Sequence, residues 1–113
     1  MRRSRRTGLE RENARIFAGD VVIDLVNRSV SRSGAVVHLT PIEWDLLRVL
    51  ASHAGRTMTH HQLFSRVWSG SHGDAQQYLR VHVASLRRKL ERDSVRPQLI
   101  ITEPGVGYRF EGE

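Results

Sequence analysis

One segment of the chain, residues 74–92, collects cations and small side chains at helical spacing. On a wheel of ~100° per residue, an apolar stripe is formed by Leu79, Val83, Leu86 and Leu90. The opposite face carries Gln77, Arg80, Val81, Ala84, Ser85 and Arg88, and it is flanked by Arg87, Lys89 and Arg92. Small side chains at the centre of such a face allow close approach, and arginines can reach bases or phosphates. The spacing therefore predicts a helix whose outer face suits the major groove of DNA.

The side chains of this face suit different contacts. Arg80 can grip guanine O6 and N7 in a bidentate way, and Val81 can meet a thymine methyl group. Arg87, Arg88 and Arg92 suit phosphates, which position a protein without specifying sequence. A basic helix face can also lie in solvent or meet an acidic protein, so spacing alone leaves both alternatives open.

Metal and enzyme chemistry find little support in the sequence. His60 and His61 are adjacent at a helix start and point in different directions, and with His53 or His72 they form no His-Glu-x-x-His pattern. The paired carboxylates are Asp24, Glu43 and Asp45, but Glu43 has a capping role and no Ser–His–Asp grouping accompanies them. The Gly105–Gly107 stretch is too short for a phosphate loop. We therefore expect no enzyme activity, no cofactor and no metal.

Length and composition agree with a small soluble domain. The chain has 113 residues, 39% of them hydrophobic, which fits one domain. It contains no Cys, which excludes disulfide scaffolds and thiol catalysis and fits a reducing cytoplasm. No apolar run approaches the ~18 residues of a membrane span, and no apolar stretch follows the basic start. We therefore expect a cytoplasmic protein with no membrane partner.

The net charge of +6 indicates an acidic partner, with nucleic acid first. Residues 1–14 hold five Arg and two Glu, which is half of that net charge. We interpret them as a flexible basic linker or arm, because Leu9 is their only large apolar residue. Two alternatives remain for this segment: an arm that contacts DNA, or a solvated tail without a partner.

The remaining chain, residues 15–113, reads as one domain of mixed α+β type. Residues 15–39 predict four short strands in two hairpins. A capping box at Thr40 and Glu43, with Pro41 at the first helical position, starts a helix that Gly55 ends. Thr57-Met58 is predicted to be a short extended link.

A second helix is predicted from Thr59, which caps it with Gln62 three residues later, to near Trp68. A loop follows, and then the helix that Asp74 opens and that extends to about Arg92. Pro97 stops any continuation, and residues 98–110 predict a closing hairpin. Short helix, loop, long basic helix and tight hairpin together indicate a helix-turn-helix variant with a wing.

Three motifs in this order closely resemble the winged-helix effector domain of OmpR/PhoB response regulators. They are residues 39–47 (LTPIEWDLL), 79–90 (LRVHVASLRRKL) and 105–110 (GVGYRF), and the resemblance covers about residues 15–111. Within the family, residues 37–43, 78–80 and 96–105 are most similar to regulators of a potassium-uptake operon. The resemblance implies sequence-specific binding of double-stranded DNA for transcriptional regulation. It also implies a winged helix-turn-helix with a four-stranded N-terminal sheet, three helices and a C-terminal hairpin wing.

Relatives touch DNA at positions that match Arg80, Val81, Ser85 and Arg87, and at a backbone-contacting Thr that matches Thr102. The matching sequence departs from some relatives at Pro104, where they carry an Arg that enters the minor groove. The wing is therefore expected to contact DNA more weakly here.

The resemblance also implies partners outside the fold. The loop at 68–73 corresponds to a contact region for RNA polymerase, although its composition equally fits a plain connector. Full regulators carry a receiver domain with a phospho-accepting Asp, which 113 residues cannot hold in addition. We therefore expect either the DNA-binding part of such a regulator or a free-standing version of that part. It should be monomeric alone and a tandem dimer on DNA when linked to a receiver. An RNA-binding alternative lacks an exposed aromatic platform.

Overall fold

The computed structural model describes residues 14–68 and 73–112, which divide into two compact units at residues 38 and 39. The predicted basic arm at residues 1–14 lies outside the described residues except for Ala14, whose carbonyl accepts the amide of Leu25. No helix in these two ranges is long and apolar enough to cross a membrane.

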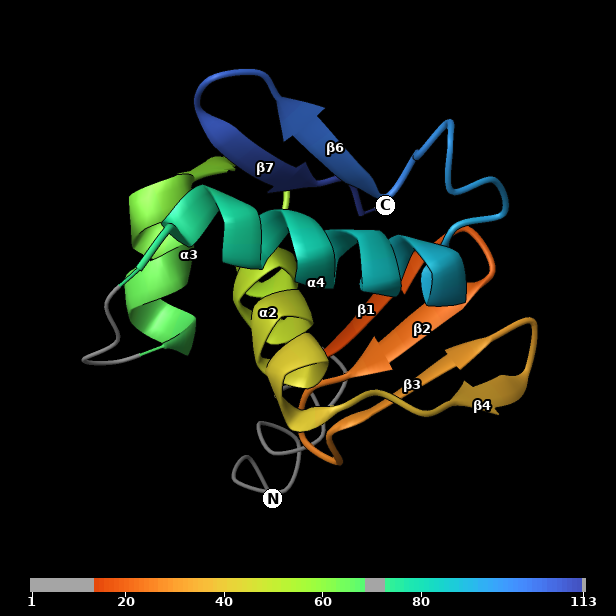
Figure 1. Cartoon of the computed structure of the whole chain (residues 1–113). Coiled ribbons are helices and arrows are strands. Elements are labelled where there is room, and N and C mark those ends of the chain that lie inside the picture. The colour runs from red at the N-terminus through yellow and green to blue at the C-terminus, as the bar shows by residue number, and fades with distance from the viewer. Residues whose placement is uncertain (1–13, 69–72, 113) are drawn as a thin grey trace. The chain divides into compact units, whose positions relative to one another are not determined.

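The N-terminal unit is a four-stranded antiparallel sheet in which each strand pairs with the next (Figure 1). Its strands are β1 (Arg15–Ala18), β2 (Val21–Asp24), β3 (Ser29–Arg32) and β4 (Ala35–Val37). Buried residues alternate with half-exposed residues along β2, and Val30 is the buried residue of β3. Val21, Ile23 and Val30 are therefore buried on one face of the sheet. Asp24 shapes the β2–β3 turn, since its carboxylate accepts the amides of Val26 and Asn27. The two predicted hairpins are confirmed.

The second unit holds three helices and a three-stranded sheet. The elements are α2 (Pro41–Ser52), β5 (Thr57–Thr59), α3 (His60–Val67), α4 (Ala75–Leu90), β6 (Ile100–Glu103) and β7 (Gly107–Phe110). The helices pack pairwise on one another, with α4 running across α2 and α3 beside its N-terminal end (Figure 1). The most deeply buried side chains include Leu46, Leu47, Leu50, Leu63, Leu79, Leu86, Leu90, Ile100 and Phe110.

Local capping signals define the starts of all three helices. Thr40 accepts the amide of Glu43 at 3.2 Å, and the Glu43 carboxylate accepts the amide of Thr40 at 2.9 Å. Thr59 and Gln62 form the same box at the start of α3. Asp74 accepts the amide of Gln77 and caps α4. Each cap binds amides that would otherwise lack helical partners, which fixes where the helix begins.

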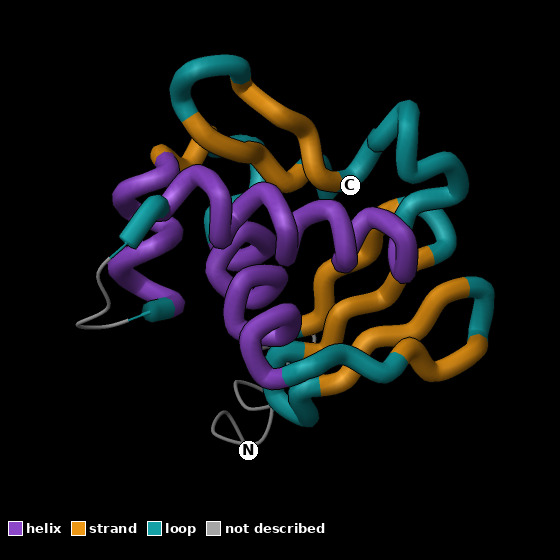
Figure 2. Tube along the Cα trace, in the orientation of Figure 1, coloured by secondary structure: helices purple, strands orange, loops and turns teal. Residues whose placement is uncertain are grey.

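The structure corrects two local predictions. Residues 57–59 are a strand, because β5 pairs with β7 and gives the sheet order β5-β7-β6 (Figure 2). The long helix ends at Leu90 and not at about Arg92, because the buried carboxylate of Glu91 accepts the backbone amides of Gln98, Leu99 and Ile100. These bonds turn the chain toward β6. Arg92 therefore lies beyond the helix.

Candidate nucleic-acid interface

The outer face of α4 presents cations around a half-buried small side chain. Arg80, Val81 and Arg88 are exposed, and Ala84 between them is half-buried. On the opposite side Leu79, Val83, Leu86 and Leu90 are at most 1% exposed. Val81 is 53% exposed, so packing in the core does not explain why this position of α4 is apolar. The predicted stripe is confirmed, and it turns Arg80, Val81 and Arg88 outward.

Arg87 lies at the edge of this face and reaches the wing. Its Nε and Nη2 atoms donate to the carbonyl of Ile100 at 3.1 and 2.7 Å, and Nη2 also donates to Thr102 Oγ1 at 2.7 Å. The guanidinium lies 5.8 Å from the ring centroid of Tyr108. Burial lowers the pKa of Arg87 from its ordinary value, but an arginine stays charged. The structure thus joins two residues that were predicted separately as DNA contacts.

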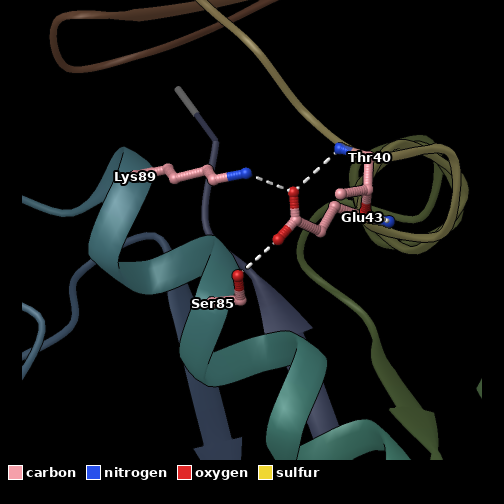
Figure 3. Close-up of polar contacts among 4 residues, drawn as sticks. All are labelled: Thr40, Glu43, Ser85 and Lys89. Carbon is pink, nitrogen blue, oxygen red and sulfur yellow. Dashed lines mark hydrogen bonds and ion pairs between the residues drawn. The ribbon is translucent and has the colours of Figure 1, made fainter.

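Ser85 and Lys89 point toward α2 from the other edge of the face (Figure 3). The hydroxyl of Ser85 donates to Oε2 of Glu43. Lys89 Nζ lies 2.6 Å from Glu43 Oε1. Glu43 is only 3% exposed, so this carboxylate is a buried junction between α2 and α4.

The environment of Glu43 keeps it ionised. Burial raises the pKa of its carboxyl, but hydrogen bonds from Lys89, Ser85 and the Thr40 amide outweigh burial and hold the pKa at about 2, against an ordinary 4.5. Because the pKa is lowered in the folded state, Glu43 stabilises the fold above about pH 4.5, and this contribution is lost as the pH falls through about 2.

We expect an acid-sensitive part of the stability to depend on Glu43. Below pH 4.5 the free energy of unfolding of the unchanged protein should fall by roughly 3 kcal/mol more than that of Glu43→Gln, since a neutral amide has no such proton linkage. Denaturant titrations from pH 6 to pH 2 measure both proteins. Equal pH profiles would contradict this role.

The wing, formed by β6, β7 and the turn between them, carries a single arginine, Arg109, and that arginine is paired. The guanidinium of Arg109 pairs with Glu103 and Glu111 on the hairpin itself. Pro104 and Gly105 follow Glu103, and Val106 is 48% exposed. Two carboxylates thus surround the single guanidinium of this hairpin. Weak DNA contacts by the wing stay a prediction.

An aromatic cluster holds the start of α4 against α3. The Phe64 and Trp68 rings stack with centroids 5.2 Å apart, and His82 meets Trp68 at 5.3 Å. Tyr78 lies 6.0 Å from both Phe64 and Trp68. Trp68 is half-exposed rather than a full core residue. Most of the proposed polymerase-contact loop, residues 69–72, lies outside the described residues.

Several polar partners could not be located from the sequence. The capping role predicted for Glu43 is confirmed, but its contacts with Ser85 and Lys89 were not predicted. The contacts of Glu91 with the amides of residues 98–100 were not predicted either. In neither case does local spacing carry a signal, because each carboxylate finds partners on another element. Among residues 14–68 and 73–112, no group of three or more His, Asp or Glu could hold a metal ion.

Comparison with known proteins places this geometry among regulators. The family described as "Transcriptional regulatory protein, C terminal" matches residues 34–110. KdpE of Escherichia coli K12, a KDP operon transcriptional regulatory protein, is 47% identical over 91 residues, which cover 80% of the chain and 40% of that relative. KdpE of Mycobacterium tuberculosis H37Rv is 42% identical over 102 residues, 90% of the chain and 45% of the relative. The chain thus spans less than half the length of these relatives.

Solved structures show the same fold. DrrB of Thermotoga maritima, an OmpR/PhoB homologue, superposes with a TM-score of 0.82 at 32% identity, over 92% of this chain and 48% of that one. The RstA DNA-binding domain of Klebsiella pneumoniae, solved in complex with the RstA box, gives a TM-score of 0.75 at 34% identity, over 86% and 96% of the two chains. The expected winged helix-turn-helix architecture is therefore confirmed.

Proposed function

The chain belongs to the OmpR/PhoB family of DNA-binding response-regulator effector domains, and from this premise we propose that α4 docks in the major groove of duplex DNA and recognises a specific sequence. The observation that carries the proposal is the outer face of α4, where Arg80, Val81 and Arg88 are exposed opposite a fully buried apolar stripe. A helix with this face fits the width of the major groove.

The side chains that we propose meet DNA divide into four groups. Arg80, Val81 and Ala84 would contact bases, and Arg88 and, beyond the end of α4, Arg92 would contact phosphates. Arg87 and Thr102 hold each other at the wing, so they would meet the backbone as a prepared pair. Ser85 uses its hydroxyl proton on Glu43, so toward a base it can only accept a hydrogen bond.

The similarity to KdpE supports a more specific proposal about the longer protein. A receiver domain would control tandem binding on DNA, the loop at 68–73 would contact RNA polymerase, and the target would be an operon for potassium uptake. Duplex DNA as the partner would place the protein's action in the cytoplasm. The DNA-bound form of the RstA domain supports duplex DNA as the partner.

The main test is a titration of the protein with duplex DNA at two salt concentrations. Arg80→Ala is expected to cost ~1–3 kcal/mol of binding and to relax the preference at one base position. Arg88→Ala is expected to weaken binding to all sequences and to lower the salt slope by ~1. Selection of bound sites from random duplexes and fluorescence anisotropy measure these effects.

Arg56→Ala is the matched control, because Arg56 is exposed and lies on neither α4 nor the wing. It should leave base preference unchanged. If the unchanged protein binds duplex DNA without salt dependence, DNA binding by α4 is wrong, and a module that meets an acidic protein becomes the better interpretation. An unchanged base preference in Arg80→Ala would remove Arg80 from the base contacts.

A further inference from the structure

Lys89 is the only lysine of the chain. It lies in the last turn of α4, next to the exposed Arg88. From its position in the sequence, Lys89 would be expected to join Arg80, Arg87 and Arg88 as a fourth cation of the DNA-binding face of α4. Its ammonium instead lies 2.6 Å from Oε1 of Glu43 on α2 (Figure 3).

Glu43, the partner of Lys89, is buried, and both of its carboxylate oxygens accept hydrogen bonds. The Glu43 side chain is 4% exposed, against 34% for Lys89. Oε1 accepts from Lys89 and from the Thr40 amide, and Oε2 accepts from Ser85. Two residues of the DNA-facing helix, one turn apart, are therefore bound to one carboxylate of α2.

Separating this pair would be unfavourable. A buried carboxylate that loses its cation remains charged in a poorly solvated place, and breaking such a pair is strongly destabilising. A DNA phosphate in solvent would offer Lys89 a screened attraction in exchange. Lys89 is therefore held by Glu43 when DNA approaches, whereas Arg88 is not.

We propose that Glu43 withholds Lys89 from the DNA backbone and so acts as a positioning residue that limits the number of phosphates that α4 contacts. Phosphate contacts contribute affinity for every sequence alike, so one fewer phosphate contact lowers the affinity and its salt dependence for every sequence and leaves base recognition unchanged. The same carboxylate links α4 to α2 through Ser85 and Lys89. This inference rests on the proposed DNA-binding function.

The test compares the unchanged protein with Glu43→Gln and with the double variant Glu43→Gln/Lys89→Gln. The ligand is a mixed-sequence DNA duplex longer than two helical turns. Glu43→Gln keeps an oxygen for the Thr40 amide but releases Lys89, so its salt slope should steepen by ~0.9, about a 3.5-fold larger loss of affinity over a fourfold rise in salt. The double variant should return to the slope of the unchanged protein. A purely structural role of Glu43 would not produce a gain that the second substitution reverses.

Two results would overturn the proposal. A folded Glu43→Gln variant with an unchanged or shallower slope shows that Lys89 is not withheld. A double variant with a slope ~1 below that of the unchanged protein shows that Lys89 already contacts phosphate. If the unchanged protein itself shows no salt-dependent binding, the proposed function fails instead, so the two failures are distinguishable.

A measurement on the unchanged protein covers the case in which Glu43→Gln does not fold. Selective ¹⁵N labelling of lysine gives one side-chain ammonium resonance, because Lys89 is the sole lysine. We expect this resonance to keep its position when the DNA duplex is added to saturation. A change in the position of this resonance in the DNA complex at low salt would mean that Lys89 has left Glu43 and would contradict the proposal.

Discussion

Gly107→Ala is expected to disrupt the wing and to cost about 3–5 kcal/mol of folding free energy. A Cβ at this position would lie 1.8 Å from the backbone oxygen of Met58 and 2.8 Å from Cα of Thr59. Both atoms belong to the backbone of β5, which pairs with Gly107 in register. No change of side-chain conformation can relieve the overlap, so β5 and β7 must separate.

Gly105→Ala is the matched control two residues away on the same hairpin. Gly105 has a φ of +75°, but nothing lies within 4 Å of a Cβ placed there. Its substitution should cost only ~1–2 kcal/mol, from the left-handed backbone. Denaturant unfolding compares the two variants, and equal losses would contradict the close approach of β5 to Gly107. Because the wing holds Arg87 through Ile100 and Thr102, DNA affinity should fall with Gly107→Ala.

Glu91→Ala should be the second severely destabilising substitution, at about 3 kcal/mol or more. The Glu91 carboxylate is 4% exposed and accepts the amides of Gln98, Leu99 and Ile100. Its removal leaves three backbone donors without these partners, two of them buried or half-buried. Each unsatisfied buried donor costs ~1–3 kcal/mol. Denaturant unfolding measures the loss, and amide hydrogen exchange at Leu99 and Ile100 locates it.

Asp93→Ala provides the control for Glu91. Asp93 is an exposed acid two residues later that accepts one amide, that of Val95, at 3.0 Å. Its loss should cost no more than ~1 kcal/mol, because solvent replaces the bond. If both substitutions had the same small effect, Glu91 would not be what ends α4 and starts β6.

Much of the fold could be predicted from the sequence. The caps at Thr40, Thr59 and Asp74 act within three residues, and the stripe from Leu79 to Leu90 repeats within two turns. Such signals are local, so they are visible in one sequence. The two N-terminal hairpins and the exposure of Arg80 and Val81 follow from the same kind of pattern.

The errors arose where a residue's partner lies on another element. The strand β5 looked like a link, because its partner β7 lies about fifty residues away in sequence and three residues carry too little pattern to show a strand. The sequence predicts a helix to about Arg92, because the first strong helix breaker after Leu90 is Pro97. Only the capture of three amides by Glu91 shows where the helix ends.

The sequence alone determined most of the elements, the buried face of α4 and the cationic character of the opposite face. The tertiary structure decided which of those cations are available. Lys89 is bound to a carboxylate 46 residues earlier, and Arg87 to a carbonyl 13 residues later, while Arg80 and Arg88 remain exposed. The physical reason is that the helical repeat sets the direction in which each side chain points. Whether its charge is paired or exposed to solvent depends on which groups the fold brings within hydrogen-bonding distance.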